Sequence, residues 1–267
     1  MRGDEQAEGE APLPTKYSNF SNVTSMNFFR LFFWFYAAHT AFAITPIDSL
    51  PHSDSRYTQG LFWKGDELWE STGLEGHSKI YRMNKKGETT DSVSMRGRHF
   101  GEGIASVGNK LLWLTWRSQV GFILEGSLHN EELKFIGQFP LYGEGWGLTV
   151  WNNQWLMSDG SSSLFVLSLG DMHVVKKIAV KFNGVPVRNL NELEAVGDTL
   201  FANVWYSDSI AVIHIPTGTV TRWLDISALA QAHRKAHHKA EVLNGIAFDG
   251  KNLWITGKFW SEIYKIE

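Results

Sequence analysis

One pattern recurs five times along the chain, and its spacing restricts the fold more than any other feature. Each repeat contains a short apolar segment, a polar turn, and a second apolar segment that ends in a small hydroxyl or amide residue. An interval of this length is typical of a four-stranded propeller blade. The pattern therefore predicts an all-β fold, a five-bladed β-propeller over residues 44–267. The anchors of the repeats, spaced by about 43 to 45 residues with a final interval of about 53, are Trp69, Trp113, Leu156, Phe201 and Trp254.

The ends of the predicted propeller suggest how the ring closes. The fifth repeat stops at Glu267 after three strands, so its outer strand must come from elsewhere in the chain. The stretch 43–50 is the spare segment, and pairing it with the last blade would remove an exposed strand edge. Pro46 is compatible with this role because proline is tolerated on an outer edge.

The long final interval predicts a short helical insertion before the last blade, over residues 225–240 with Ser227 as its N-cap. His233, His237 and Glu241 fall about one turn apart, which is a spacing that a metal site could use. Glu241, however, stands where the helix should already be ending. Basic neighbours would also repel a cation, so we interpret the segment as a solvated surface helix. These neighbours are Arg234, Lys235 and Lys239.

The first 43 residues predict export. Residues 1–25 are polar and are expected to be disordered or to lie outside the true reading frame. Residues 26–43 have one arginine, a short apolar run and the ending Ala41-Phe42-Ala43, as in a secretory signal peptide cleaved after Ala43. An uncleaved membrane anchor is the alternative, although the run is short for a span. We expect a periplasmic or secreted protein with no stable membrane association after cleavage.

Composition narrows the function classes. The absence of cysteine excludes thiol catalysis, thiolate metal sites and a lipid anchor on cysteine. The net charge of −3 argues against nucleic acid as a partner, since that usually requires a basic face. A closed propeller has no intrinsic need to associate, so a monomer is expected.

Polar and aromatic residues recur at one structural position of the repeats. In a blade, the start of the first strand and the end of the second reach the same rim. An apolar cup with a few convergent polar groups is typical of a small-molecule or chain-end site. A buried acid there should have a raised pKa, although each tryptophan could pack between blades and each glutamate could satisfy backbone donors. The rim positions include Gln59, Glu102, Trp116, Glu144, Trp146, Asn191, Trp205, Asn244 and Lys258.

Eight short segments resemble the signature blocks of the plant and bacterial glutamine cyclotransferase family. In order they read YTQGL (57–61), FGEG (100–103), LTW (114–116), GWGL (145–148), LNELE (190–194), NVW (203–205), LNGI (243–246) and TGK (256–258). The resemblance implies a five-bladed propeller and an acyltransferase that cyclises N-terminal glutamine of peptides and proteins to pyroglutamate with release of ammonia. This family is unrelated to the zinc-dependent animal type, so no cofactor is expected to be required, and a structural cation in the central channel is left open.

The resemblance also assigns roles to individual residues. It implies Glu102 as the catalytic acid, with Gln59, Asn191 and Lys258 as its polar partners. We also predict that Glu144 binds substrate, because it lies at the rim in the repeat pattern. The family usually has adjacent His and Asp residues before the first block. Here they are separated, as His52-Ser53-Asp54, so the resemblance assigns no role to either residue. The aromatic pocket would consist of Phe100, Trp116, Trp146 and Trp205, with Tyr57 where the family usually has phenylalanine.

Two other function classes remain open. One is a hydrolase or lyase in which Glu102 and Glu144 act as paired acids, for example on glycans, because tryptophans also stack on sugars. The other is a non-enzymatic propeller that binds peptide or sugar through the tryptophan rim.

Overall fold

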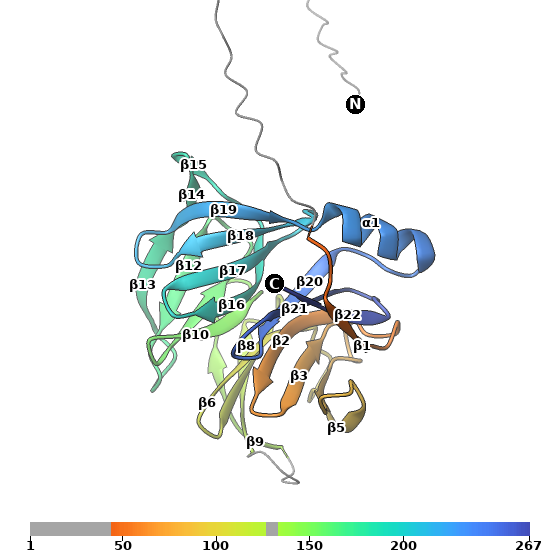
Figure 1. Cartoon of the computed structure of the whole chain (residues 1–267). Coiled ribbons are helices and arrows are strands. Elements are labelled where there is room, and N and C mark those ends of the chain that lie inside the picture. Colours follow the sequence, from red (N-terminus) through yellow and green to blue (C-terminus); the bar gives the residue numbers. More distant parts are fainter. Residues whose placement is uncertain (1–43, 127–132) are drawn as a thin grey trace, which may run out of the picture. The chain divides into compact units, whose positions relative to one another are not determined.

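The computed structural model describes residues 44–126 and 133–267, so the predicted leader and signal peptide lie outside the described residues. Five sheets, antiparallel apart from one short parallel pair in the fourth, make up this part of the chain (Figure 1). The innermost strands contact one another in cyclic order, from the first sheet through the fifth and back to the first. This arrangement confirms the predicted five-bladed β-propeller.

The first three blades are regular four-stranded antiparallel sheets. Blade 1 contains β2 (Thr58–Lys64), β3 (Glu67–Thr72), β4 (Lys79–Met83) and β5 (Thr89–Ser94). Blade 2 contains β6 (Gly101–Val107), β7 (Lys110–Thr115), β8 (Val120–Glu125) and β9 (Lys134–Pro140). Blade 3 contains β10 (Leu148–Trp151), β11 (Gln154–Ser158), β12 (Ser163–Leu167) and β13 (Val174–Ala179).

Blade 4 is larger than the repeat predicts. Its regular strands are β16 (Leu190–Val196), β17 (Thr199–Val204), β18 (Ser209–His214) and β19 (Thr219–Asp225). A short hairpin of β14 (Lys181–Phe182) and β15 (Val185–Pro186) extends this sheet, with β14 parallel to β19. The hairpin meets β19 at one residue pair, Lys181 with Thr219, at the start of that strand.

Blade 5 closes the ring with a strand from the other end of the described chain. It contains β20 (Leu243–Phe248), β21 (Leu253–Gly257) and β22 (Glu262–Ile266), and its fourth strand is β1 (Asp48–Pro51). Leu50 of β1 pairs with Ile263 of β22 (Figure 1). The predicted closure is therefore confirmed, although the strand begins later than expected and leaves Pro46 outside it.

The hydrophobic core lies between blades, where the repeated anchor residues meet. Phe62 and Trp69 of blade 1 pack with Ile104 and Trp113 of blade 2 in one buried cluster. Each sheet thus buries both faces against its neighbours. Burying aromatic side chains of this size supplies much of the stability of such a core.

Near the axis the inner strands approach closely. A Cβ atom on Gly147 would lie 2.0 Å from the carbonyl oxygen of Asn191, and one on Gly103 would lie 2.5 Å from that of Trp146. Glycine is needed at both positions because any side chain would collide with the neighbouring inner strand. The same contacts hold the residues that begin each inner strand close together.

A buried ionic network ties the closing segment to the first blade. Glu70 accepts hydrogen bonds from Arg56 Nη1 at 2.9 Å and from Thr58 Oγ1 at 2.8 Å, and His52 Nε2 lies 3.0 Å from the same carboxylate. Burial alone would raise the pKa of Glu70, but the charges and hydrogen bonds of these partners lower it from 4.5 to about 2. His52 Nδ1 in turn lies 2.7 Å from the carbonyl oxygen of Trp260, which links the network to blade 5.

One helix, α1 (Ser227–Ala236), lies between β19 and β20 (Figure 1). The insertion is confirmed, but the predicted N-cap is wrong. Ile226 occupies the cap position and makes no side-chain capping bond, while Asp225 accepts a hydrogen bond from the Ser227 amide at 2.9 Å. No helix in the described ranges is long and apolar enough to cross a membrane.

The expectation of a solvated surface helix is also wrong for one face of α1. Ala230 and His233 are buried, and the His233 ring stacks on Trp260 with 4.6 Å between ring centroids. Packing against the last blade removes this face from water. Of the basic side chains that suggested solvation, Arg234 and Lys235 lie at other positions of the helix and Lys239 lies beyond its end.

Candidate active site

A pocket lies where the inner strands begin and the second strands end. All five blades contribute to it, which follows from the cyclic order of the inner strands. The structure therefore brings together nine of the ten residues predicted as site residues. The lining residues are Tyr57, Gln59, Phe100, Glu102, Trp116, Trp146, Asn191, Trp205 and Lys258.

Glu102 is the acid of this pocket and is 5% exposed. Gln59 Nε2 donates a hydrogen bond to Glu102 Oε1 at 3.1 Å. Burial raises the pKa of Glu102 well above its ordinary value; nearby Lys258 opposes this effect and Glu144 adds to it. A carboxyl in this environment binds a proton far more tightly than one in water, as proton transfer near neutral pH requires.

Asn244, at the start of the last inner strand, fixes the orientation of Gln59. Its Nδ2 donates to Gln59 Oε1 at 3.0 Å and to the carbonyl oxygen of Thr58 at 2.9 Å. The Gln59 amide must therefore turn its donor toward Glu102. Asn244 stands in the rim pattern of the sequence, but only the structure shows that it supports the acid through Gln59.

Lys258 follows β21 and is 3% exposed, so it is a buried group and not a charge on the rim. Its Nζ lies 4.4 Å from the centroid of the Tyr57 ring, in cation–π contact. Burial lowers the pKa of Lys258, while Glu102 and Glu241 oppose the shift. The lysine brings a positive charge, or a readily transferred proton, to the side of the pocket that holds Tyr57.

The apolar walls consist of aromatic rings in edge contact. Phe100 and Trp116 have centroids 5.6 Å apart, and Trp146 and Trp205 have centroids 5.5 Å apart at 89°. Tyr57 packs on Phe100 at 5.9 Å. Burial raises the pKa of Tyr57 to about 12, with smaller effects from Glu241, Glu102 and Tyr206. The tyrosine is therefore neutral and acts as part of the wall.

Glu144 does not line the pocket, but it holds two of its walls. One carboxylate oxygen, Oε2, accepts hydrogen bonds from the indole N–H of Trp116 at 2.8 Å and of Trp146 at 2.9 Å. The other, Oε1, accepts from Arg117 Nε at 2.9 Å. Burial alone would raise the pKa of Glu144, but these donors outweigh it and lower the pKa. Glu144 is thus an ionised anchor for the two rings.

Asn191 offers the pocket an unused hydrogen-bonding group. It is 4% exposed, and its side-chain Oδ1 is buried with no partner among the described residues. A buried acceptor without a donor is costly, and such groups are common where a ligand supplies the donor. Its backbone carbonyl is held by Ser158 Oγ at 2.7 Å, so the position of Asn191 is fixed.

Two further carboxyl groups of β16 lie between inner strands. Glu192 accepts hydrogen bonds from the backbone N–H of Leu61 at 3.2 Å and of Ile246 at 2.8 Å. Glu194 accepts one from Phe248 at 2.9 Å. Burial raises the pKa of both, that of Glu194 to about 8. These groups join blade 4 to blades 1 and 5 and are not part of the pocket.

Comparison with known proteins gives consistent similarities over most of the chain. Residues 25–267 match the family model described as glutamine cyclotransferase. A glutaminyl-peptide cyclotransferase of Arabidopsis thaliana is 36% identical over 236 residues, which cover 86% of this chain and 72% of that protein. The crystal structure of a glutaminyl cyclase of Myxococcus xanthus has a TM-score of 0.76 and 31% identity, and the match covers 84% of this chain and 96% of that one.

Proposed function

This chain belongs to the glutamine cyclotransferase family, and we infer that it converts the N-terminal glutamine of peptides and proteins to pyroglutamate with release of ammonia. The observation that carries this function is the pocket itself. A buried acid, Glu102, lies beside the amide of Gln59 in a cup that also contains Lys258 and five aromatic side chains. Such a cup suits one uncharged side chain together with the amino end of a peptide.

The reaction needs one proton to move from one nitrogen to another. The neutral α-amine attacks the γ-carbonyl carbon, and a C–N bond forms. Glu102 takes the proton released by the attacking nitrogen and delivers it to the γ-nitrogen, so that the old C–N bond breaks and ammonia leaves. The carboxylate is regenerated. Because burial raises the pKa of Glu102 well above that of an ordinary carboxyl group, Glu102 can hold the proton between its release by the attacking nitrogen and its delivery to the leaving one.

Lys258 and Asn191 suit the charges and hydrogens that the reaction presents. We assign Lys258 to the oxygen of the tetrahedral intermediate, where a buried positive charge is most effective. The partnerless Oδ1 of Asn191 would accept a hydrogen bond from the substrate amine or from its backbone amide. Both groups are buried, so water does not weaken these interactions.

The aromatic walls supply orientation. Cyclisation requires the glutamine side chain to fold back on its own amine, a conformation that a free peptide rarely holds. Edge-packed rings such as Trp146 and Trp205 leave a narrow slot that favours the folded form. Glu144 maintains the slot by holding Trp116 and Trp146, and so we assign it a positioning role in place of direct substrate binding. The three hydrogen bonds that Glu144 accepts, from Trp116, Trp146 and Arg117, argue against Glu144 as the second acid of a glycosidase pair.

We propose that the reaction needs no cofactor, because the pocket residues can perform every proton transfer. Glu192 and Glu194, whose carboxyl groups lie between inner strands, are candidate ligands for a structural cation. Their backbone hydrogen bonds and raised pKa values already account for both groups without an ion. Removal of divalent ions is therefore expected to leave the rate of cyclisation unchanged.

We further propose that the protein acts outside the cytoplasm, as a monomer. Support for export comes from the sequence of residues 26–43. Support for a monomer comes from the closed ring, in which β1 covers the edge of β22. Fractionation of cells that express the full chain, and light scattering of the purified protein, test these two points.

The function is tested with three matched peptides. A peptide that begins with glutamine is expected to release one ammonia per molecule. The same peptide with an acetylated amine lacks the nucleophile, and one that begins with asparagine would need a strained four-membered ring, so both are expected to be inert. If the folded protein binds the glutamine peptide and releases no ammonia, the binding-module alternative is correct.

A further inference from the structure

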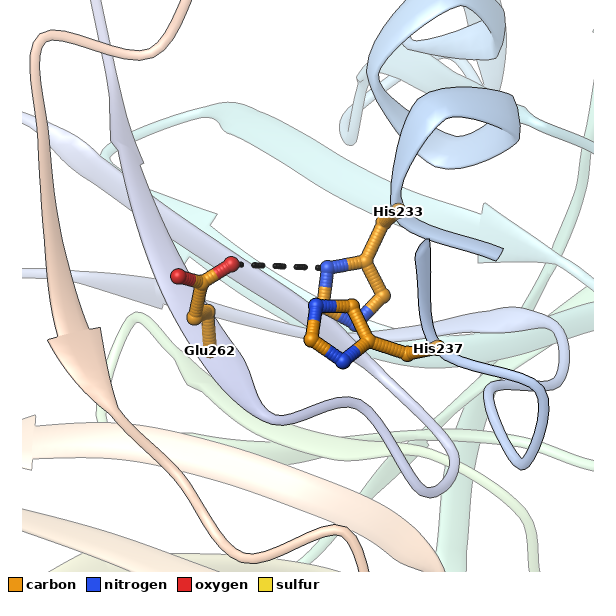
Figure 2. Close-up of side chains that lie close together, drawn as sticks. All are labelled: His233, His237 and Glu262. Atoms are coloured by element: carbon orange, nitrogen blue, oxygen red, sulfur yellow. Dashed lines mark ion pairs between the residues drawn. The ribbon is translucent and has the colours of Figure 1, made fainter. Parts of the chain in front are cut away.

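A second group of potential ligands lies apart from the pocket, where α1 meets the last blade. Figure 2 shows His233 and His237 facing Glu262 of β22. One ligand atom from each of these three side chains lies within 4.8 Å of the others. None of the three lines the pocket. The sequence spacing had suggested Glu241 as the third member, but its backbone N–H instead donates to the carbonyl oxygen of Lys258.

The end of the helix places the two imidazoles on one face. The backbone N–H of His237 donates to the carbonyl oxygen of His233 at 2.9 Å, which continues the helical turn by one residue. The ring centroids are 4.4 Å apart. His233 is held between this ring and Trp260, and its side chain is fully buried. A pair of histidines four residues apart on one helical face is a recurrent zinc-binding arrangement.

The donor atoms are spaced as ligands of one small ion would be. His233 Nδ1 and Glu262 Oε2 are 3.5 Å apart (Figure 2). Two ligands of a tetrahedral zinc ion, each about 2 Å from the metal, are separated by about 3.4 Å. The three ligand atoms lie within 4.8 Å of one another, so a rotation of the half-buried His237 side chain would bring the whole set to this spacing.

The neighbouring polar groups are compatible with a metal. The hydroxyl of Tyr264 lies 2.8 Å from His233 Nδ1 and also contacts the Glu262 carboxylate. A metal ion would take the place of the Tyr264 hydroxyl at His233 Nδ1. The hydrogen bond from Tyr264 to Glu262 would then orient the ligating carboxylate. The other ring nitrogen, Nε2, is 3.4 Å from the Ser261 amide. In this contact the amide N–H donates to Nε2, so metal binding at Nδ1, which places the ring proton on Nε2, would give up a long and weak hydrogen bond.

The basic residues around the cluster are less repulsive than their positions in the sequence suggest. Arg234 forms two hydrogen bonds with the carboxylate of Asp208, at 2.9 and 2.5 Å. Lys239 pairs with Asp54 at 3.0 Å. Each of these charges is therefore balanced by a partner, and Glu262 adds a negative charge at the cluster itself.

We propose that His233, His237 and Glu262 bind one divalent transition-metal ion of the zinc class, with water as the fourth ligand. Two imidazoles and one carboxylate are a donor set that zinc accepts readily. The ion would join α1 to β22, next to the strand pair that closes the ring. Its expected role is to stabilise the folded protein, and it takes no part in the pocket.

The test is zinc binding by the chelator-treated full chain, measured by titration calorimetry and by thermal unfolding. We expect one zinc per chain, a higher unfolding temperature with zinc, and unchanged peptide cyclisation. His237→Ala and Glu262→Gln should each weaken binding by about tenfold or more, since they remove one ligand. His238→Ala, which removes the exposed neighbouring histidine, should bind like the parent protein.

Cobalt(II) provides a second measurement that does not depend on stability. Tetrahedral coordination by His233, His237 and Glu262 should give intense visible absorption in the parent and in His238→Ala, and should lose it in His237→Ala. The unfolding temperature without metal shows whether each variant is folded. The proposal is overturned if the folded parent binds no zinc, or if His237→Ala and Glu262→Gln bind it as tightly as His238→Ala does.

Discussion

Gln59 donates a hydrogen bond from Nε2 to Oε1 of Glu102 at 3.1 Å, and this contact connects blade 1 to blade 2 beside the reacting group. Because Asn244 donates to the oxygen of the same Gln59 amide, the amide has one orientation available. The acid is therefore held by a partner that can only donate to it. The positions of three inner strands, β2, β6 and β20, therefore fix the Glu102 carboxyl group that the proposed reaction uses for proton transfer.

Replacing Gln59 by Leu should lower kcat and leave KM nearly unchanged. The variant keeps the volume of the side chain and removes the donor to Glu102. A hydrogen bond to a charged group contributes about 1.5–3 kcal/mol, so a fall in kcat of about 10- to 100-fold is expected. Steady-state kinetics on a glutamine-initiated peptide measure it. An unchanged kcat would show that Glu102 needs no support from Gln59.

Glu144→Gln should have a different kinetic effect from Glu102→Gln. Glutamine at position 144 keeps one acceptor oxygen in place of two, so its NH2 group must face either the two indole N–H groups or Arg117, and the anchor of Trp116 and Trp146 is weakened. We expect KM to rise by about tenfold, about 1.4 kcal/mol of binding, while kcat falls much less. Loss of kcat as complete as in Glu102→Gln would instead favour the paired-acid hydrolase.

Glu102→Gln should stabilise the protein at alkaline pH while it abolishes turnover. The pKa of Glu102 is raised in the folded state. Its favourable contribution to the free energy of folding is therefore present below the pKa of the unfolded chain, and it is lost as the pH rises through the pKa of the folded protein. Glutamine mimics the protonated form at every pH. The melting temperature of the variant should exceed that of the parent at roughly pH 9, and the difference should shrink toward roughly pH 4. A variant that is less stable at the alkaline end would contradict the assigned burial.

Glu70 should have the opposite pH dependence. Its folded pKa is lowered to about 2, so its contribution is present above the unfolded value of 4.5 and is lost as the pH falls toward 2. Glu70→Gln leaves the buried Arg56 without its counter-charge, and a loss of about 3–5 kcal/mol is expected near neutral pH. Urea unfolding of both proteins measures the difference, which should narrow between pH 4.5 and 2. A constant difference across this range would contradict the ionic role.

The repeat predicts the blades because every blade meets the same physical requirement. A sheet that buries both faces needs apolar strands and tight turns at regular intervals, and the anchors from Trp69 to Trp254 mark these intervals directly. The rim residues follow from the same repeat, since equivalent positions in a ring converge on its axis. The nine lining residues were found in this way and by family resemblance.

Other features depend on contacts between distant segments and leave no periodic signal. The hairpin of β14 and β15 is two residues per strand, too short for any pattern. The hydrogen bonds of Glu144 to Trp116 and Trp146 depend on side-chain directions that spacing alone does not determine. The charge of Arg234 suggested solvent, whereas the neighbouring His233 is buried against Trp260 because β22 covers that face.

The proposed reaction depends on Glu102, which transfers the proton that lets ammonia leave. The direct measurement is ammonia release from a glutamine-initiated peptide, with mass spectrometry of the product, for the parent and for Glu102→Gln at matched concentration. We predict that the parent yields a product lighter by one ammonia, and that the folded variant binds the peptide without converting it. Conversion by Glu102→Gln at the rate of the parent would contradict the account.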